Sequence, residues 1–219
     1  VIKRTTSISL GRTDLLTWAH RTVRRLSASL RSTLTAEFAR PLMEPILHPS
    51  RWRIRALGLS TAVGHPLFYL FWGLWLPQPY EPLNLRLVMC ALGLSLLVFR
   101  PLYSSPPSTA SAAVFTAIFW VTLPLYFSWM FLCNGGNPVW LASMSAMFLI
   151  YYQLTDWRIA TLGSLTGGLA AWLAFDTFGP VVPTMSTGQI ATSTIVLAFS
   201  WYMAIMLGLS SSNLRREQI

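Results

Sequence analysis

Acidic residues are scarce in this 219-residue chain, in which seven Asp and Glu stand against sixteen Lys and Arg. Charged residues make up only 11% of the sequence and hydrophobic residues 53%, whereas soluble globular domains are roughly one quarter charged. Such a composition excludes an ordinary soluble domain and indicates that lipid surrounds most of the chain. No nucleic-acid partner is expected, because eleven of the sixteen cations lie in the first 55 residues and belong to a tail.

Cysteine is also rare. Cys90 and Cys133 are the only two, and neither belongs to a CxxC or Cys/His pattern. A disulfide framework and a zinc site are therefore not indicated. The sequence contains no nucleophile elbow, P-loop or metal-ligand cluster, so we expect no catalytic residue, no metal and no cofactor. Arginines also interrupt every apolar stretch in the first fifty residues, which argues against a cleaved signal peptide.

Six hydrophobic segments follow the basic tail, several of them near the roughly 20 residues that cross a bilayer. They cover residues 54–76, 84–103, 109–132, 138–154, 157–175 and 187–209. The sequence therefore predicts an all-α, polytopic membrane protein with six transmembrane helices. We expect it to be a multi-pass protein of a bacterial inner (cytoplasmic) membrane.

The positions of the cations predict the orientation of these helices. Arg100, Arg158 and the basic ends flank one set of loops, and cations accumulate on the cytoplasmic side of a membrane, so both termini are expected in the cytoplasm. Arg86 is the exception at an outer helix end, and we expect it to form an ion pair with Glu81. The loops without Lys or Arg are residues 77–83, 134–138 and 176–186.

Residues 13–40 carry apolar side chains at helical spacing with arginines between them, which predicts a basic amphipathic helix. Two interpretations remain open: the helix lies on the anionic cytoplasmic leaflet, or it docks onto a partner or onto the cytoplasmic ends of the other helices. The predicted divisions are a cytoplasmic N-terminal segment at 1–50, a six-helix transmembrane domain at 51–209 and the start of a cytoplasmic signalling helix at 210–219.

His65 is the only histidine within a predicted span, and an ionisable residue at membrane depth is a candidate for function. It could bond a ligand carbonyl, satisfy a backbone group freed by Pro66, or ligate a pigment or haem. Tyr69 and Trp72 follow it on one side of the helix, and Tyr69 lies too deep for an interfacial aromatic belt. A cavity lined by such rings and a few hydroxyl groups would suit an amphiphilic small molecule.

Trp140 and Ser143 form a second candidate pair, three residues apart and therefore on the same face of the fourth helix. An indole wall beside a hydroxyl group suits a ligand contact. Small residues in membrane helices also serve close helix packing. Both interpretations remain open from the residues alone.

Residues 64–86, GHPLFYLFWGLWLPQPYEPLNLR, resemble the first hairpin of the membrane sensor module of CqsS/LqsS-type α-hydroxyketone quorum-sensing histidine kinases. A second stretch is similar to the same family, and the two together span about residues 58–175. Six helices is also that family's membrane architecture. The matching positions of the second stretch are Phe115, Thr116, Leu123, Pro124, Phe127, Met130, Trp140, Ser143, Met144, Phe148, Asp156 and Arg158.

The resemblance implies a membrane receptor module that binds a small hydrophobic signal, an α-hydroxyketone autoinducer, and signals to a cytoplasmic histidine kinase of a two-component system. It implies a homodimer as well, and histidine kinase activity only if the chain continues beyond Ile219 into a phosphoacceptor helix. The competing hypothesis is an accessory or structural subunit of a larger membrane complex that contacts pigment or quinone. The residues expected to bind the ligand are His65, Tyr69, Trp72, Trp140, Ser143, Phe148 and Trp201.

Overall fold

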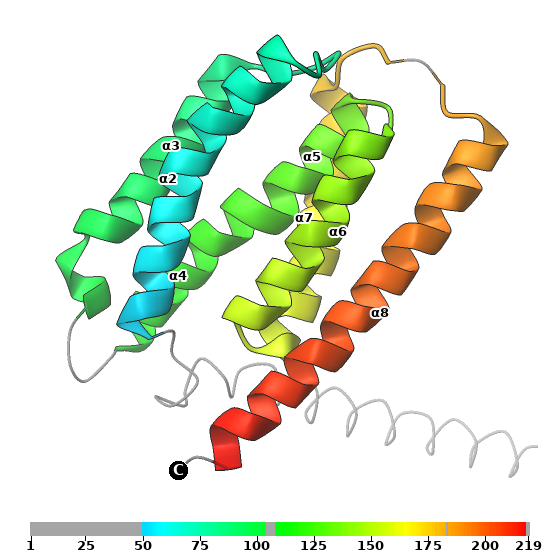
Figure 1. Ribbon diagram of the computed structural model, residues 1–219. Coiled ribbons are helices and arrows are strands. Elements are labelled where there is room, and N and C mark those ends of the chain that lie inside the picture. The colour runs from blue at the N-terminus through cyan, green and yellow to red at the C-terminus, as the bar shows by residue number, and fades with distance from the viewer. Residues whose placement is uncertain (1–49, 104–107, 183, 218–219) are drawn as a thin grey trace, which may run out of the picture. The chain divides into compact units, whose positions relative to one another are not determined.

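A computed structural model describes residues 50–103, 108–182 and 184–217, and over these residues it is helical and has no strand. The all-α prediction is confirmed for this part of the chain, whereas the amphipathic helix predicted at 13–40 lies outside it. A 3-10 turn, η2 (Arg100–Tyr103), follows α3, and a π-helical turn, η3 (Val121–Leu125), joins α4 to α5. The α-helices are α2 (Arg51–Leu74), α3 (Leu83–Val98), α4 (Thr109–Trp120), α5 (Tyr126–Cys133), α6 (Pro138–Leu154), α7 (Trp157–Phe178) and α8 (Thr187–Glu217) (Figure 1).

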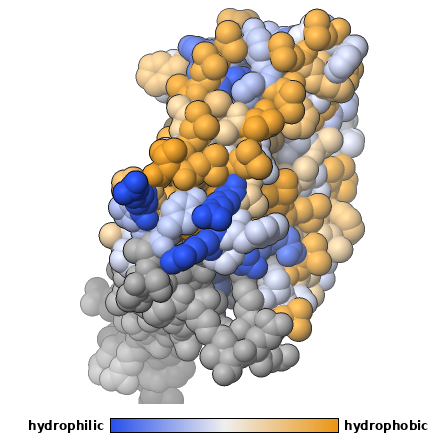
Figure 2. All heavy atoms as spheres, turned by 60° about the vertical axis from the view of Figure 1, so that its left-hand side comes forward, coloured by the Kyte–Doolittle hydropathy of each residue, from blue (hydrophilic) through white to orange (hydrophobic). Residues whose placement is uncertain are grey.

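Three helical segments are long and apolar enough to cross a membrane: Ala110–Cys133, Trp157–Phe178 and Thr187–Ser211. The first of them comprises α4, η3 and α5, and α3 is a shorter apolar helix. Figure 2 shows hydrophobic atoms over much of one side of the molecule, with hydrophilic residues gathered toward the end at which α2 begins. Exposed apolar surface on helices of this length indicates a membrane protein.

α2 and α3 form a hairpin whose backbones lie in close contact. A Cβ added at Gly93 would lie 2.6 Å from the backbone nitrogen of Ala62, so only glycine allows this approach. Pro66 has no N–H group to donate to Ala62, one turn earlier in α2. The thiol of Cys90 on α3 donates to the Ala62 carbonyl instead, at 3.1 Å. Cys90, not His65, therefore satisfies the backbone group that the proline frees.

The middle of the bundle is organised around the π-helical turn η3. Pro124 lies within this turn, which adapts the helix to a residue without an N–H donor. α7 approaches closely here, because a Cβ at Gly167 would lie 2.7 Å from the Cβ of Pro124. α5 packs against α7, and α6 packs against α8. The line of contact thus runs from the π-helical turn through α7 and α6 to the last helix.

The three loops that lack Lys and Arg lie together at one end of the helices (Figure 1). Asn134 joins two of them: its Oδ1 accepts from the Tyr80 N–H and its Nδ2 donates to the Tyr80 carbonyl, both at 3.0 Å. Asn137 donates to the Gln78 side chain at 2.9 Å. These bonds hold the α2–α3 loop against the α5–α6 loop.

α8 continues past the last predicted span. The sequence predicted a span at 187–209 followed by the start of a signalling helix at 210–219. The structure has one continuous helix of 31 residues, Thr187–Glu217. The run of small polar residues from Ser210 does not break the helix, since serine in a helix bonds back to a carbonyl one turn earlier, as Ser211 does to Leu207 at 2.9 Å.

Candidate functional site

The candidate site is built on Arg86, which lies one turn into α3 and is buried. Its Nε lies 2.5 Å from Oε1 of Glu81 and its Nη2 lies 3.2 Å from Oε2. This is a two-point guanidinium–carboxylate pair, the arrangement in which such ion pairs are strongest. The Arg86 side chain is 4% exposed and that of Glu81 is 9% exposed. The two residues expected to pair do so, and the pair is enclosed by the bundle rather than exposed at its end.

His65 on α2 forms a further hydrogen bond with the guanidinium of Arg86. Its Nδ1 lies 3.3 Å from Nη1 of Arg86. A guanidinium has only donors, so Nδ1 must accept and the imidazole must be neutral with its proton on Nε2. The imidazole also meets the ring of Tyr126 edge-on, with centroids 4.8 Å apart. His65 therefore orients Arg86 from one side while Glu81 orients it from another.

Two aromatic rings flank the same guanidinium. The Arg86 Cζ lies 5.4 Å from the ring centroid of Tyr126 and 5.5 Å from that of Trp140, within the range of a cation–π interaction. The Tyr126 hydroxyl and the Trp140 indole nitrogen are buried and have no hydrogen-bond partner among the described residues. Buried polar atoms are nearly always partnered, so two unsatisfied donors beside one buried guanidinium mark this cluster as a candidate site.

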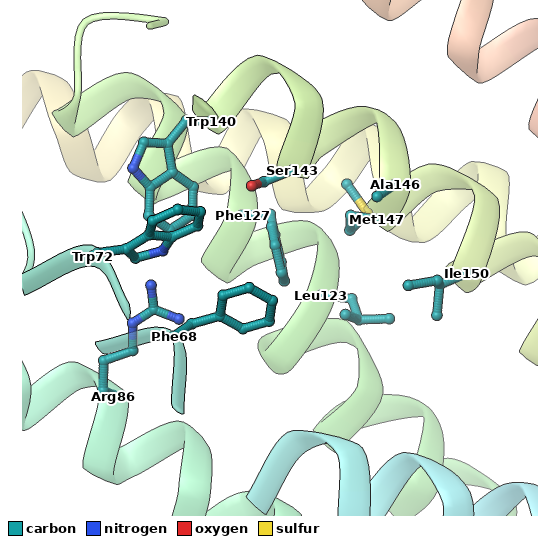
Figure 3. Close-up of a pocket in the computed structure, with 10 residues that line it drawn as sticks. All are labelled: Phe68, Trp72, Arg86, Leu123, Phe127, Trp140, Ser143, Ala146, Met147 and Ile150. Atoms are coloured by element: carbon teal, nitrogen blue, oxygen red, sulfur yellow. The ribbon is translucent and has the colours of Figure 1, made fainter. Parts of the chain in front are cut away.

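A pocket of about 180 Å³ lies beside Arg86 (Figure 3). Its two ends differ: Arg86, Trp72 and Trp140 lie together at one end, and Leu123 and Ile150 lie at the other. The volume is smaller than the 300–1,000 Å³ of sites for drug-sized ligands, which suits a small molecule. The lining residues are Phe68, Trp72, Arg86, Leu123, Phe127, Trp140, Ser143, Ala146, Met147 and Ile150.

The structure brings together three of the seven residues expected to bind a ligand, since Trp72, Trp140 and Ser143 all line the pocket. His65 stands behind Arg86 and does not line it. Tyr69 is half-buried and does not line it either. The reason is helix geometry: Phe68 and Trp72 are four residues apart and stack at 5.5 Å, so they present the pocket face of α2, from which Tyr69 is rotated away.

Phe148 and Trp201 do not line the pocket, although they belong to the apolar cluster that also contains Leu123 and Met147; their ring centroids lie 6.5 Å apart, between α6 and α8. The indole nitrogen of Trp201 donates to the Tyr152 hydroxyl at 2.6 Å, and that hydroxyl donates to Thr161 at 2.9 Å. Phe148 and Trp201 therefore join α6 to α8 instead of lining the pocket, and Tyr152 extends the connection to α7. Phe148 faces away from the pocket because its neighbours Met147 and Ile150 occupy the pocket side of α6.

The ligand residues predicted from the sequence did not include Phe68, Leu123, Phe127, Ala146, Met147 and Ile150, although helical spacing gave a signal for those on α6. Trp140 and Ser143 define a face of α6, and continuing that face at helical spacing leads to Met147 and Ile150. Arg86 was expected as a structural ion pair only. The position of Arg86 in the pocket depends on how α3 is rotated against α2, and no local pattern in the sequence predicts that rotation.

No three His, Cys, Asp or Glu side chains within residues 50–103, 108–182 and 184–217 are grouped so that they could hold a metal ion. The chain was also compared with known proteins. No protein-family model matches it, and no solved structure matches it. The chemistry of the pocket itself is therefore the basis for a functional conclusion.

Proposed function

We propose that this chain is the membrane-embedded receptor module of a two-component system and that the pocket beside Arg86 binds an α-hydroxyketone. The observation that carries the proposal is the polarity of the pocket, with buried donors at one end and apolar walls at the other. An α-hydroxyketone has the same polarity, two adjacent oxygens followed by a hydrocarbon tail. The resemblance of residues 64–86 to sensors of such signals supports the same ligand class.

The head group of this ligand matches the groups at the polar end. A ketone oxygen accepts hydrogen bonds, and the N–H groups of Arg86 and Trp140 are donors there. The ligand hydroxyl can both donate and accept. Ser143 already donates to the Val139 carbonyl at 2.9 Å, so its oxygen remains able to accept from that hydroxyl. The polar end can thus form hydrogen bonds with both oxygens of the ligand, neither of which carries a charge.

The tail would run along the apolar walls toward the surface of the bundle. Phe68 and Ile150 line the pocket and are 51% and 47% exposed. These two residues belong to α2 and α6, so the apolar end of the pocket opens between those helices. In a membrane this opening would face hydrocarbon, and a ligand tail longer than the pocket would extend into it without exposure to water.

In this proposal all six helical segments cross a bacterial inner membrane with both termini in the cytoplasm. α2 begins with Arg51, Arg53 and Arg55 at the interface, and residues 56–74 then contain no acidic or basic side chain other than the neutral imidazole of His65. α6 has 17 residues and starts at a polar cap, Asn137. The loops without cations share one end of the helices, which supports placing that end in the periplasm.

The path to an output runs through α6. This helix supplies Trp140, Ser143, Met147 and Ile150 to the pocket and packs on α8 with its other side. Tyr152 on α6 accepts from Trp201 on α8, so a shift of α6 on ligand binding would reach the helix that leads toward the cytoplasm. We propose that two copies of the chain form a dimer and pass this shift to a histidine kinase.

The topology predicts the labelling of single cysteines by a membrane-impermeant maleimide. In a background with Cys90→Ser and Cys133→Ala, Val181→Cys should be labelled in cells whose outer membrane is permeable and whose inner membrane is intact. Arg100→Cys should be labelled only after the inner membrane is also breached. Val181 and Arg100 are exposed at opposite ends of the helices, so each is the control for the other. The reverse pattern would overturn the orientation.

Filling the pocket tests the binding function. Ala146 lines the pocket, and Ala142, one turn earlier on α6, is exposed and does not. Ala146→Trp should abolish calorimetric binding of a medium-chain α-hydroxyketone to the purified protein, because the indole occupies the tail channel. Ala142→Trp should leave the affinity within about threefold of the wild type, a change below about 0.7 kcal/mol. If the wild-type protein binds no such ketone, the receptor proposal fails and the accessory-subunit hypothesis replaces it.

A further inference from the structure

The charge of the guanidinium at the pocket is balanced by one partner. Glu81 is the only acidic side chain that pairs with Arg86 among the residues the structure describes, and it uses both carboxylate oxygens to do so. His65, the third polar group at the cluster, is neutral because it accepts from Arg86. The polar end of the pocket therefore presents donors but little net charge.

Arg86 still has donors to offer. A guanidinium has five N–H groups, and its bonds in this structure are two to Glu81 and one to His65. One N–H on Nη1 and one on Nη2 remain without a partner among the described residues. Arg86 lines the pocket, and Figure 3 shows its guanidinium close to Trp72 and Trp140 at the polar end.

We propose that Glu81 sets the selectivity of the pocket, making it accept a head group of two adjacent uncharged oxygens and reject a carboxylate on the same tail. The inference rests on the proposed function and adds to it the charge class of the ligand. A carboxylate would place a second negative charge next to a buried Glu81 whose cation is already paired, and like charges close together in a buried site repel strongly. A hydroxyketone brings oxygens without charge and meets no such repulsion.

This selectivity has a physical purpose in a bilayer. A fatty acid has the same shape as a hydroxyketone, a small oxygen-bearing head on a hydrocarbon tail, and the apolar walls of the pocket cannot tell the two tails apart. An arginine without a partner would favour the fatty acid, because a guanidinium binds a carboxylate at two points. Glu81 occupies the Nε and Nη2 side of Arg86, and its negative charge repels a carboxylate that approaches the remaining N–H groups on Nη1 and Nη2.

The test is Glu81→Gln, which keeps the shape and one acceptor oxygen but removes the charge. The probes are an α-hydroxyketone and an n-alkanoate of equal carbon number, measured by calorimetry at about pH 8, where the acid is ionised. Wild-type protein should bind the hydroxyketone at least about tenfold more tightly than the alkanoate. Glu81→Gln should move this ratio toward the alkanoate by at least about tenfold. Asp176→Asn removes an exposed acid away from the pocket and should leave the ratio unchanged.

The outcomes separate the two proposals. If the wild-type protein binds the hydroxyketone and Glu81→Gln leaves the ratio as it was, the selectivity role of Glu81 is wrong and the receptor function stands. If neither probe binds any variant, the receptor function itself is wrong. If Glu81→Gln does not fold, the ratio of the two affinities in the wild-type protein decides. An alkanoate that binds as tightly as the hydroxyketone would contradict the proposal that Glu81 neutralises Arg86.

Discussion

Replacing Arg86 by leucine should destabilise the protein by about 3–5 kcal/mol, the cost of leaving a buried ion without its partner. Glu81 is 9% exposed and paired with Arg86 through both oxygens, so the substitution strands a carboxylate among the helices. The nitrogen of His65 would lose its donor at the same time. Unfolding by heat or by denaturant in a mild detergent measures the loss.

A double-mutant cycle isolates the pair from the other effects. Glu81→Gln with Arg86→Leu should recover part of the loss caused by Arg86→Leu alone, because no unpaired charge then remains buried. Arg100→Leu is the control for loss of an arginine, and at an exposed position it should change stability by less than about 0.5 kcal/mol. Additive effects of Glu81→Gln and Arg86→Leu would show that the two side chains are not energetically coupled.

Trp140→Ala should cost about 3–5 kcal/mol in stability, which is typical of removing a large buried aromatic side chain. Trp140 is 2% exposed, and its ring packs against those of Tyr126 and Phe127 at centroid distances of 6.3 and 6.2 Å. The same substitution removes the wall shared by head group and tail. We therefore expect it to weaken binding of a hydroxyketone and of the matching simple ketone alike.

Trp140→Phe separates the indole nitrogen from the ring. The nitrogen has no partner among the described residues, so its removal costs no hydrogen bond in the unliganded protein, and the loss of stability should be well below that of Trp140→Ala. A donor lost from a buried ligand oxygen costs about 1–3 kcal/mol, or about five- to a hundredfold in affinity. Equal hydroxyketone affinities for wild type and Trp140→Phe would exclude the indole nitrogen as a ligand donor.

The helices and their order could be predicted from sequence because both follow from local properties. A run of apolar residues near 20 in length can satisfy its backbone groups in lipid only by forming a helix, whatever it packs against. The pairing of Glu81 with Arg86 could also be predicted, because the two residues lie five positions apart in the sequence. A lone cation at an apolar helix end needs a counter-charge, and only one acid stood within a few residues.

The sequence by itself determined the helical class, the six apolar segments, the Glu81–Arg86 pair and three of the pocket residues, all of which depend on neighbours along the chain or on helical spacing. Only the tertiary structure decided that Cys90 bonds the Ala62 carbonyl, that Phe68 and not Tyr69 faces the pocket, and that Phe148 and Trp201 join helices elsewhere. These outcomes depend on how each helix is rotated about its axis. In helices that are apolar all round, hydrophobic periodicity does not reveal that rotation, and close contacts such as Gly93 against Ala62 set it instead.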